Sequence, residues 1–160
     1  MAEDAPAEDS GAPPPKQGVF VFPNGARYEG QFTGNEPAAA PAEEGAPPPA
    51  EGQEKPPVPV RHGIGVYKLD GNEYEGEWVQ DKMHGHGLFK FMSGDTYDGA
   101  WAANKFQGQG KYMWNNGAYY IGEWVDNKMH GEGMFVDTEG RQWKGKFYNG
   151  QGPGLHTLPL

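Results

Sequence analysis

The chain has 160 residues, a formal net charge of −9 and no cysteine. A chain of this length has room for one ordered domain, and disulfides and cysteine-ligated metal centres are excluded. No apolar run approaches the roughly 20 residues that span a bilayer, and the acidic start lacks the basic and apolar segments of a signal peptide. We therefore expect a soluble, cytoplasmic protein.

Acidic charge is concentrated in the first part of the chain. Residues 1–61 carry 10 acidic and 4 basic side chains, whereas residues 62–160 carry 12 and 9. Nucleic acids and anionic membranes both select clusters of lysine and arginine. The longest basic cluster is RQWKGK, at residues 141–146. This distribution argues against nucleic acid as a partner and makes membrane binding an unexpected role.

Two segments contain no aromatic residue and are rich in proline and alanine. Residues 1–17 form an acidic tail, and residues 33–61 form an insert. Neither buries enough apolar surface to offset its ordering entropy, so we expect both to be disordered. KPPVPV, at residues 55–60, suits polyproline II and could dock a proline-reading domain. A plain solvated linker is the simpler interpretation.

The rest of the chain repeats with a period of 23 residues. Successive copies begin at Tyr74, Tyr97 and Tyr120, and a shortened copy begins at Trp143. An earlier copy begins at Tyr28 and is split by the insert. A period of this kind predicts one supersecondary unit per copy. The predicted organisation is a repeat region at residues 18–32 and 62–154, followed by a C-terminal tail at residues 155–160.

Each copy contains two short strand patterns, Tyr-x-Gly-x-Trp and a segment that starts after Gly-x-Gly. Because side chains alternate across a strand, Tyr74, Gly76 and Trp78 share one face, and Glu75 and Glu77 take the other. Glycine is poor inside a strand, but it suits a position that a neighbouring ring covers. Each histidine before a Gly-x-Gly is expected to start the second strand.

Glycine-containing turns connect the strands. Asn-Gly at residues 24–25 and 116–117, Asp-Gly at 70–71 and Ser-Gly at 93–94 join one copy to the next. Asn-Gly and Asp-Gly are strong hairpin signals, with positive φ expected at both central positions. The sequence therefore predicts an all-β protein, a single-layer twisted antiparallel meander with one aromatic and one charged face.

These motifs at this period closely resemble the MORN-repeat family (membrane occupation and recognition nexus). The resemblance covers about two-thirds of the chain and includes three consecutive copies in phase. Gln107 replaces the usual histidine, and the split copy is one residue shorter than the others. The last copy, which runs GQGPGLH, lacks the second Gly-x-Gly position.

The resemblance implies a non-enzymatic protein. Members of the family act as scaffolds, dimerisation platforms and docking surfaces, and they occur in radial spokes of cilia and flagella, in membrane-junction proteins and beside lipid kinases. It therefore implies a structural scaffold or adaptor, with an axonemal complex such as a radial spoke as the leading setting. The alternative is a peripheral membrane or phosphoinositide-binding adaptor that uses Arg141, Lys144 and Lys146.

The histidines in MHGHG (residues 83–87) and MHGEG (residues 129–133) raise the possibility of a metal site. Equivalent positions in a meander are two strand spacings apart, about 10 Å, whereas zinc ligands lie about 2 Å from the metal. Equivalent histidines therefore cannot share an ion, and we expect no metal. His86 does not repeat and is the histidine that the architecture explains least.

No arrangement of residues predicts catalysis. The two serines, Ser10 and Ser93, lie in the tail and in a turn, and the strand carboxylates face outward as solvated surface. The glycine pairs are not phosphate loops, because no helix follows them. We expect no catalytic residue, no cofactor and no enzymatic activity.

The aromatic face is the predicted interaction site. A single-layer sheet leaves both faces uncovered, and large exposed apolar patches mark binding surfaces. Ring-on-glycine packing and sheet twist could instead shield the apolar area, and the open sheet edges are a further route to self-association. The residues predicted to bind a protein partner, or a second copy of the chain, are Tyr74, Trp78, Tyr97, Trp101, Tyr120, Trp124, Trp143 and Phe147.

Overall fold

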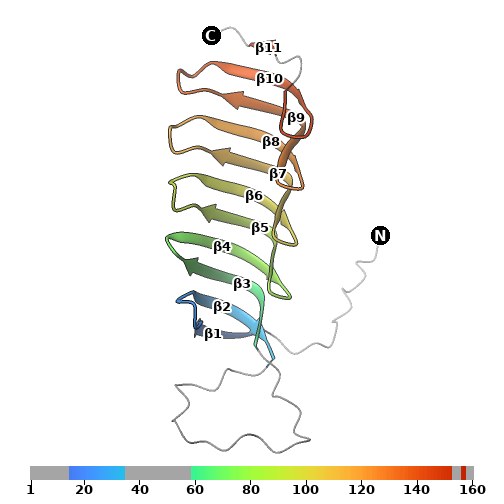
Figure 1. The fold of residues 1–160 in the computed structure, drawn as a ribbon. Coiled ribbons are helices and arrows are strands. Elements are labelled where there is room, and N and C mark those ends of the chain that lie inside the picture. Colours follow the sequence, from blue (N-terminus) through green and yellow to red (C-terminus); the bar gives the residue numbers. More distant parts are fainter. Residues whose placement is uncertain (1–14, 35–58, 153–155, 158–160) are drawn as a thin grey trace, which may run out of the picture.

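The computed structural model describes residues 15–34, 59–152 and 156–157. These residues form eleven strands and no helix, and the strands pair in chain order in one antiparallel sheet (Figure 1). The strands are β1 (Lys16–Val21), β2 (Arg27–Thr33), β3 (Val60–Leu69), β4 (Asn72–Val79), β5 (Lys82–Lys90), β6 (Thr96–Ala102), β7 (Lys105–Met113), β8 (Tyr119–Val125), β9 (Lys128–Val136), β10 (Gln142–Phe147) and β11 (His156–Thr157). The predicted all-β single-layer meander is confirmed.

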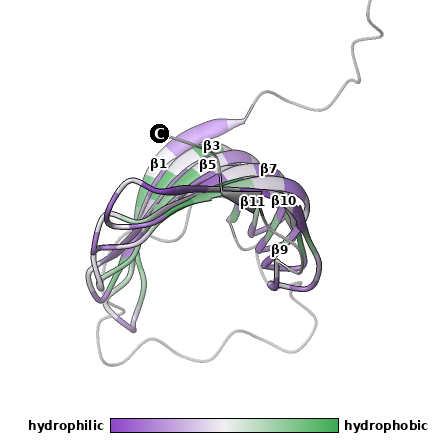
Figure 2. Cartoon of the chain, turned by 90° about the horizontal axis from the view of Figure 1, so that it is seen from above, coloured by the Kyte–Doolittle hydropathy of each residue, from purple (hydrophilic) through white to green (hydrophobic). Residues whose placement is uncertain are grey.

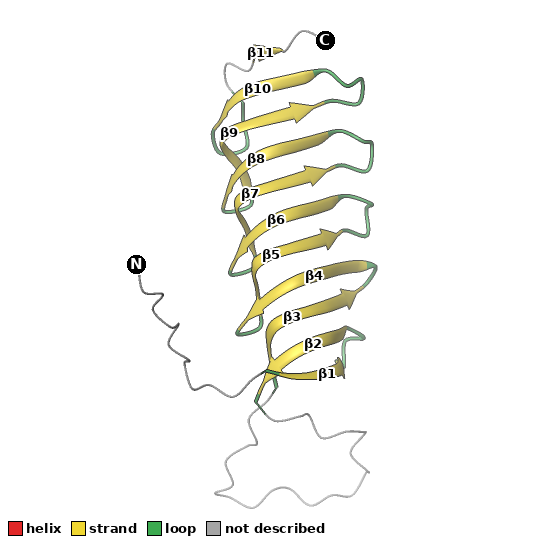
Figure 3. Cartoon of the chain, turned by 180° about the vertical axis from the view of Figure 1, so that it is seen from behind, coloured by secondary structure: helices red, strands yellow, loops and turns green. Residues whose placement is uncertain are grey.

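The sheet is strongly curved. Seen along the stack of hairpins, the strands curl into an arch, and the hairpin turns line its two rims (Figure 2). From behind, consecutive hairpins follow one another at a regular rise (Figure 3). The arch has one concave side, which runs the length of the stack.

A continuous row of glycines crosses the first ten strands. Each glycine lies directly opposite the glycine of the next strand. The row is Gly18, Gly30, Gly65, Gly76, Gly87, Gly99, Gly110, Gly122, Gly133 and Gly145. Two residues along every strand lies a ring, and these rings also pair directly: Phe20, Tyr28, Tyr67, Tyr74, Phe89, Tyr97, Tyr112, Tyr120, Phe135 and Trp143.

The two glycines of each Gly-x-Gly have different roles. Gly76 pairs with Gly87, but the next residue, Glu77, pairs with His84. Two residues of β5, Gly85 and His86, are therefore extra and form a β-bulge, with Gly85 at φ +59°. The prediction that His84 starts the strand is wrong, because the strand begins earlier and the bulge follows His84. Such bulges bend the bulged strand and increase its twist.

The same bulge recurs in three other strands. Gly63 in β3, Gly108 in β7 and Gly131 in β9 also have positive φ, and the pairing register shifts beside each of them. A bulge at the same place in four units adds the same bend each time. The regular curl of the arch follows from this repetition.

The turns are of two kinds. Asp70–Gly71 has positive φ at both central residues, as predicted for Asp-Gly. At residues 24–25 and 116–117 only the glycine has positive φ, and each glycine donates a hydrogen bond to the carbonyl three residues earlier. Both Asn-Gly segments join paired strands, as predicted, but the expectation of positive φ at both central residues is wrong there. These loops are longer than the turn at Asp70–Gly71, so the asparagine precedes the one residue that has positive φ.

Several boundaries differ from those predicted. β1 begins at Lys16, β2 extends to Thr33 and β3 begins at Val60, so the sheet takes residues that composition had assigned to the disordered segments. Strand β11 also lies within the predicted tail and pairs with β10. Pairing with an ordered neighbour extends these strands beyond their apolar residues. The other residues predicted to be disordered, 1–14 and 35–58, lie outside the described residues.

The outer face of the sheet is mixed rather than uniformly charged. Lys68 and Lys90 both form ion pairs with Glu73, at 2.7 and 3.0 Å. Between such charges lie exposed aliphatic side chains, such as Ile64 (57% exposed) and Ile121 (41% exposed). Scattered exposed aliphatic residues are normal on a protein surface.

Candidate partner-binding surface

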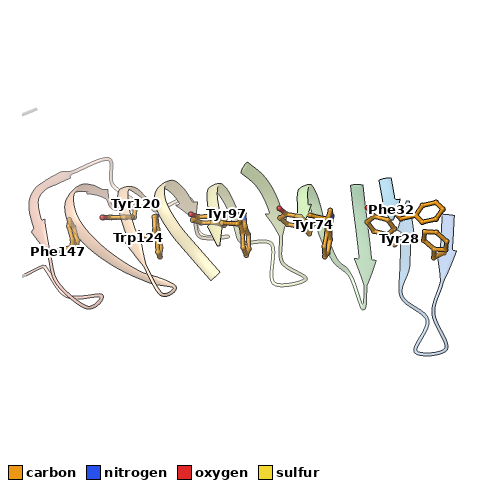
Figure 4. Close-up of a cluster of buried hydrophobic side chains, with 10 residues drawn as sticks. Tyr28, Phe32, Tyr74, Tyr97, Tyr120, Trp124 and Phe147 are labelled. Carbon is orange, nitrogen blue, oxygen red and sulfur yellow. The ribbon is translucent and has the colours of Figure 1, made fainter. Parts of the chain in front are cut away.

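The tyrosines that open each unit form the deepest layer of the core. Tyr28, Tyr74, Tyr97 and Tyr120 are 0% exposed, and the labelled rings lie in a row along the sheet (Figure 4). The Tyr74 ring covers the glycine row, since a Cβ built on Gly76 would lie 2.7 Å from the Tyr74 hydroxyl. The glycines are thus required by close approach of a ring.

Each of these hydroxyls has an acceptor in its own unit. The Tyr74 hydroxyl donates to the Glu77 carbonyl at 3.0 Å, and the Tyr97 hydroxyl donates to the Ala100 carbonyl at 2.8 Å. Burial raises the pKa of Tyr28 and Tyr120 to about 12 and moves the pKa of Tyr74 upward as well. These side chains are therefore neutral donors at physiological pH.

Tryptophans connect one unit to the next. The Trp101 indole N–H donates to the carbonyl of Gly87 in the preceding strand at 3.0 Å. Its ring meets Tyr74 of the preceding unit and Tyr97 of its own unit edge to face, with centroids 5.2 Å apart in both pairs. Trp78 and Trp124 make equivalent indole hydrogen bonds. Edge-to-face pairs add stability beyond the area that they bury.

Most of the residues predicted to bind a partner are therefore part of the core. Tyr74, Trp78, Tyr97, Trp101, Tyr120, Trp124 and Phe147 are at most 5% exposed. Only Trp143 of the predicted set is partly exposed. Sequence alternation placed all of them on one face correctly, but it does not tell a ring in contact with solvent from one covered by its neighbours. Their role in binding stays a prediction.

A second set of side chains forms the accessible surface over this core. They are partly buried and pack on the deeper rings. We call the surface that they line the trough: Phe22, Tyr67, Met83, Phe89, Phe91, Phe106, Tyr112, Trp114, Met129 and Phe135. All described strands belong to the one sheet, so no second layer in the described part of the chain covers the trough.

Residues beside the glycine row have a function that the sequence pattern does not predict. Glu77 lies on the outer polar face, as predicted, and its carboxylate also accepts a hydrogen bond from the His86 backbone N–H in the bulge at 3.0 Å. Gln31 accepts in the same way from the N–H of Ile64 at 2.8 Å. Gln31, Glu77 and Glu123 each stand directly after the glycine of Tyr-x-Gly, and a Gln or Glu at that position is the sequence signal for this contact.

The described residues contain no group of side chains that could hold a metal ion. No three histidine, cysteine or acidic side chains in residues 15–34 and 59–152 are grouped so that they could hold a metal ion. His86 lies 3.4 Å from an Asp98 carboxylate oxygen, and both side chains are more than half exposed. No helix that could cross a membrane occurs in the part of the chain that the structure describes.

The fold and this surface define a class: a single-layer β-repeat protein that presents an apolar trough. A family model described as MORN repeat matches residues 17–27, 74–96, 97–119 and 120–140. The matched segments are MORN repeats, which are non-enzymatic modules that mediate protein or membrane interactions. The split copy shares the glycine pairing and the bulge of the matched copies. No curated protein matches the chain.

Proposed function

We propose that the protein is a non-enzymatic scaffold or adaptor that binds a protein partner along the trough. The observation that supports this most directly is the row of phenylalanine, tyrosine, tryptophan and methionine side chains over the core, which no described strand covers. Aromatic residues and methionine are the side chains enriched at protein interfaces. Their rigid support from the buried tyrosines limits the ordering cost of binding.

The dimensions suit a long, narrow partner. Ten strands give nine spacings of about 4.8 Å, a trough on the order of 43 Å long. An α-helix of about 29 residues, or a shorter extended segment, has this length. A partner that lies along the trough contacts every unit, so its affinity is spread over the stack. The occupant is an apolar helical or extended segment of a larger assembly.

The proposal is tested with paired charge substitutions. Tagged full-length protein identifies partners by affinity purification and mass spectrometry, and each purified candidate is then titrated. Met83→Glu with Met129→Glu places two charges in the trough, whereas Ile64→Glu with Ile121→Glu places two on the outer face as a matched control. We expect at least a tenfold loss of affinity for the trough pair and little change for the control. Equal effects would rule the trough out as the binding surface.

Membrane binding is the alternative outcome. Of its proposed basic residues, Arg141 pairs with Asp137 at 2.7 Å and with Glu139 at 3.0 Å, and Lys146 lies 3.9 Å from Glu132. These carboxylates reduce the local positive potential that anionic lipids require. Sedimentation with vesicles that contain phosphatidylserine or phosphoinositide should leave the protein in solution at physiological salt. Clear co-sedimentation favours the lipid adaptor.

We also propose an axonemal setting, within a ciliary complex such as a radial spoke, and hence a place in the cytoskeleton of a cilium or flagellum. This rests on the family resemblance and not on the geometry of the sheet. Tagged protein at endogenous level should co-localise with axonemal tubulin and stay there after detergent extraction. A diffuse cytoplasmic signal that detergent removes would contradict it.

A further inference from the structure

We propose that Arg61 recognises the carboxylate of an acidic side chain on the partner segment and so fixes which way round that segment lies in the trough. This inference rests on the proposed function, because it assigns one end of the same surface. It names a chemical requirement on the partner: a glutamate or aspartate near the end of an apolar segment.

Arg61 occupies a position that is apolar in the other units. It pairs with Phe32, whereas Met83 pairs with Trp78 and Met129 pairs with Trp124. The corresponding residue of the third unit is Phe106. The repeat by itself therefore needs an apolar side chain here. One cation replaces it in β3, near the end of the trough where β1 lies.

The guanidinium lies across the aromatic surface. Its Cζ is 4.2 Å from the centroid of the Trp78 ring and 5.0 Å from that of Tyr67. The side chain is only 21% exposed. Contact with two rings restricts the guanidinium group and partly removes it from water. A guanidinium fixed in this way needs less ordering when it binds an anion.

Asp81 occupies one edge of the guanidinium. Nε donates to Asp81 Oδ1 at 3.0 Å, and Nη2 donates to the Asp81 carbonyl at 3.1 Å. A guanidinium has five N–H donors. Within residues 15–34 and 59–152, the edge formed by Nη1 and Nη2 therefore keeps the paired donors that match a carboxylate. Beside it lies a recess lined by Phe22, Pro23, Asn24, Arg61 and Tyr67.

The position of the guanidinium favours a side-chain carboxylate. The Trp78 and Tyr67 rings flank Arg61, so a ligand must reach between aromatic groups. The methylenes of glutamate or aspartate can enter such a space while the partner backbone stays above the trough. A chain-terminal carboxylate is attached directly to the backbone, which would itself have to enter the recess.

Small probes test this site on the full-length protein. Butyrate carries the carboxylate and methylenes of a glutamate side chain, butyramide is its neutral counterpart, and N-acetylphenylalanine carries a main-chain carboxylate. Each is titrated while the Arg61 Nε–H and Trp78 Nε1–H resonances are followed. We expect saturable shifts with butyrate, at an apparent affinity at least tenfold higher than that of either other probe. Equal response to butyramide, tighter binding of N-acetylphenylalanine, or no response to butyrate would overturn the inference.

Two variants complete the test. Arg61→Met installs the residue that other units carry, so the fold should survive, and it should abolish the butyrate response. Arg61→Lys keeps the positive charge but lacks the planar guanidinium, and it should lose most of the butyrate response. A butyrate response that survives Arg61→Met would overturn the inference.

The binding assays separate this inference from the proposed function. If the trough pair lowers the affinity for the partner tenfold while Arg61→Met does not lower it, the proposed function is supported and the role of Arg61 is disproved. If the trough pair has no effect, the proposed function falls, whatever the butyrate response.

Discussion

Glycine and tyrosine are interdependent in this sheet. A glycine in a strand normally costs stability, because it packs no side chain. Here the Tyr74 ring supplies the missing contact and donates its hydroxyl proton to the Glu77 carbonyl. The pairing could be predicted from the sequence, because Tyr-x-Gly puts both residues on one face. The carbonyl that accepts the tyrosine hydroxyl could not be predicted, because the distance between hydroxyl and carbonyl depends on how far the ring leans over the glycine.

Gly87→Ala should be among the most destabilising single substitutions. A Cβ there would lie 2.6 Å from Cζ of the buried Tyr74 ring, which has no room to move. We expect a loss of about 3 kcal/mol in the free energy of unfolding, measured with urea. Gly117→Ala is the control, since its Cβ would meet nothing within 4 Å. Its positive φ should cost only about 1 kcal/mol, so equal losses would disprove the role of the ring.

Alkaline pH should unfold the protein through the buried tyrosines. Burial raises the pKa of Tyr120 and Tyr28 to about 12, whereas tyrosine in the unfolded chain titrates near 10. The unfolded state therefore loses its protons first. Stability is fully present below about pH 10 and falls as the pH rises toward about 12.

Urea midpoints measured between neutral pH and about pH 11, together with tyrosinate absorbance, check this dependence. Tyr120→Phe removes one contributing group, and its midpoint should fall less steeply with pH than that of the parent protein. Parallel curves for the two proteins would show that Tyr120 does not contribute.

At the scale of strands and turns, neighbouring units are joined by their turns as well as by their strands. The Met83 N–H donates to Asn104 Oδ1 at 2.8 Å, and the Asn104 N–H returns a hydrogen bond to the Met83 carbonyl at 3.0 Å. Phe106 and Asn127 make the same pair of bonds one unit later. The turn between β6 and β7 therefore fixes the start of β5, and the turn between β8 and β9 fixes the start of β7.

Asn104 combines two effects that substitutions can separate. Its φ is +70°, which asparagine and glycine tolerate better than alanine. Asn104→Ala should lose both the side-chain acceptor and the conformational preference, at a cost of about 2 kcal/mol. Asn104→Gly should lose only the acceptor, at about 1 kcal/mol. Thermal and urea unfolding measure both; identical losses would mean that φ makes no difference.

Strand positions could be predicted more easily than bulges. The alternation of Tyr74, Gly76 and Trp78 assigns one face directly. Whether Gly85 and His86 are paired or extra cannot be read from the same pattern, because a bulge changes the residue count on one strand only. Whether these two residues are paired depends on the register between β4 and β5, and that register is set by contacts between the two strands.

For the whole molecule, stability should be that of a linear array of units. Each unit contacts its neighbours through paired strands, turns and tryptophans, and all eleven described strands pair in chain order. In such proteins, stability is approximately a sum of unit terms and nearest-neighbour terms. A defect in one interface should therefore weaken coupling across it.

Trp101→Ala should reveal this coupling. Trp101 contacts Tyr74, Phe89, Tyr97 and Phe106, and its removal should cost about 3–5 kcal/mol. We expect amide exchange to accelerate most in β5 and β6 and least in β9 and β10. Exposed Met92→Ala is the control and should leave exchange unchanged. Uniform acceleration over all strands would instead mean that the sheet unfolds as a single cooperative unit.

The sequence by itself determined the repeat, the strand faces, the chain-order meander and the family, because all of these depend on local periodicity. Only the tertiary structure decided which rings are accessible. Trp101 and Trp114 are both aromatic residues of the same face, yet the first is 4% exposed and the second lies partly open above the core. The difference arises because the curl of the sheet brings rings of adjacent units together. Only the tertiary structure also placed Arg61 over Trp78, because the antiparallel pairing of β3 with β4 brings the start of β3 beside the end of β4.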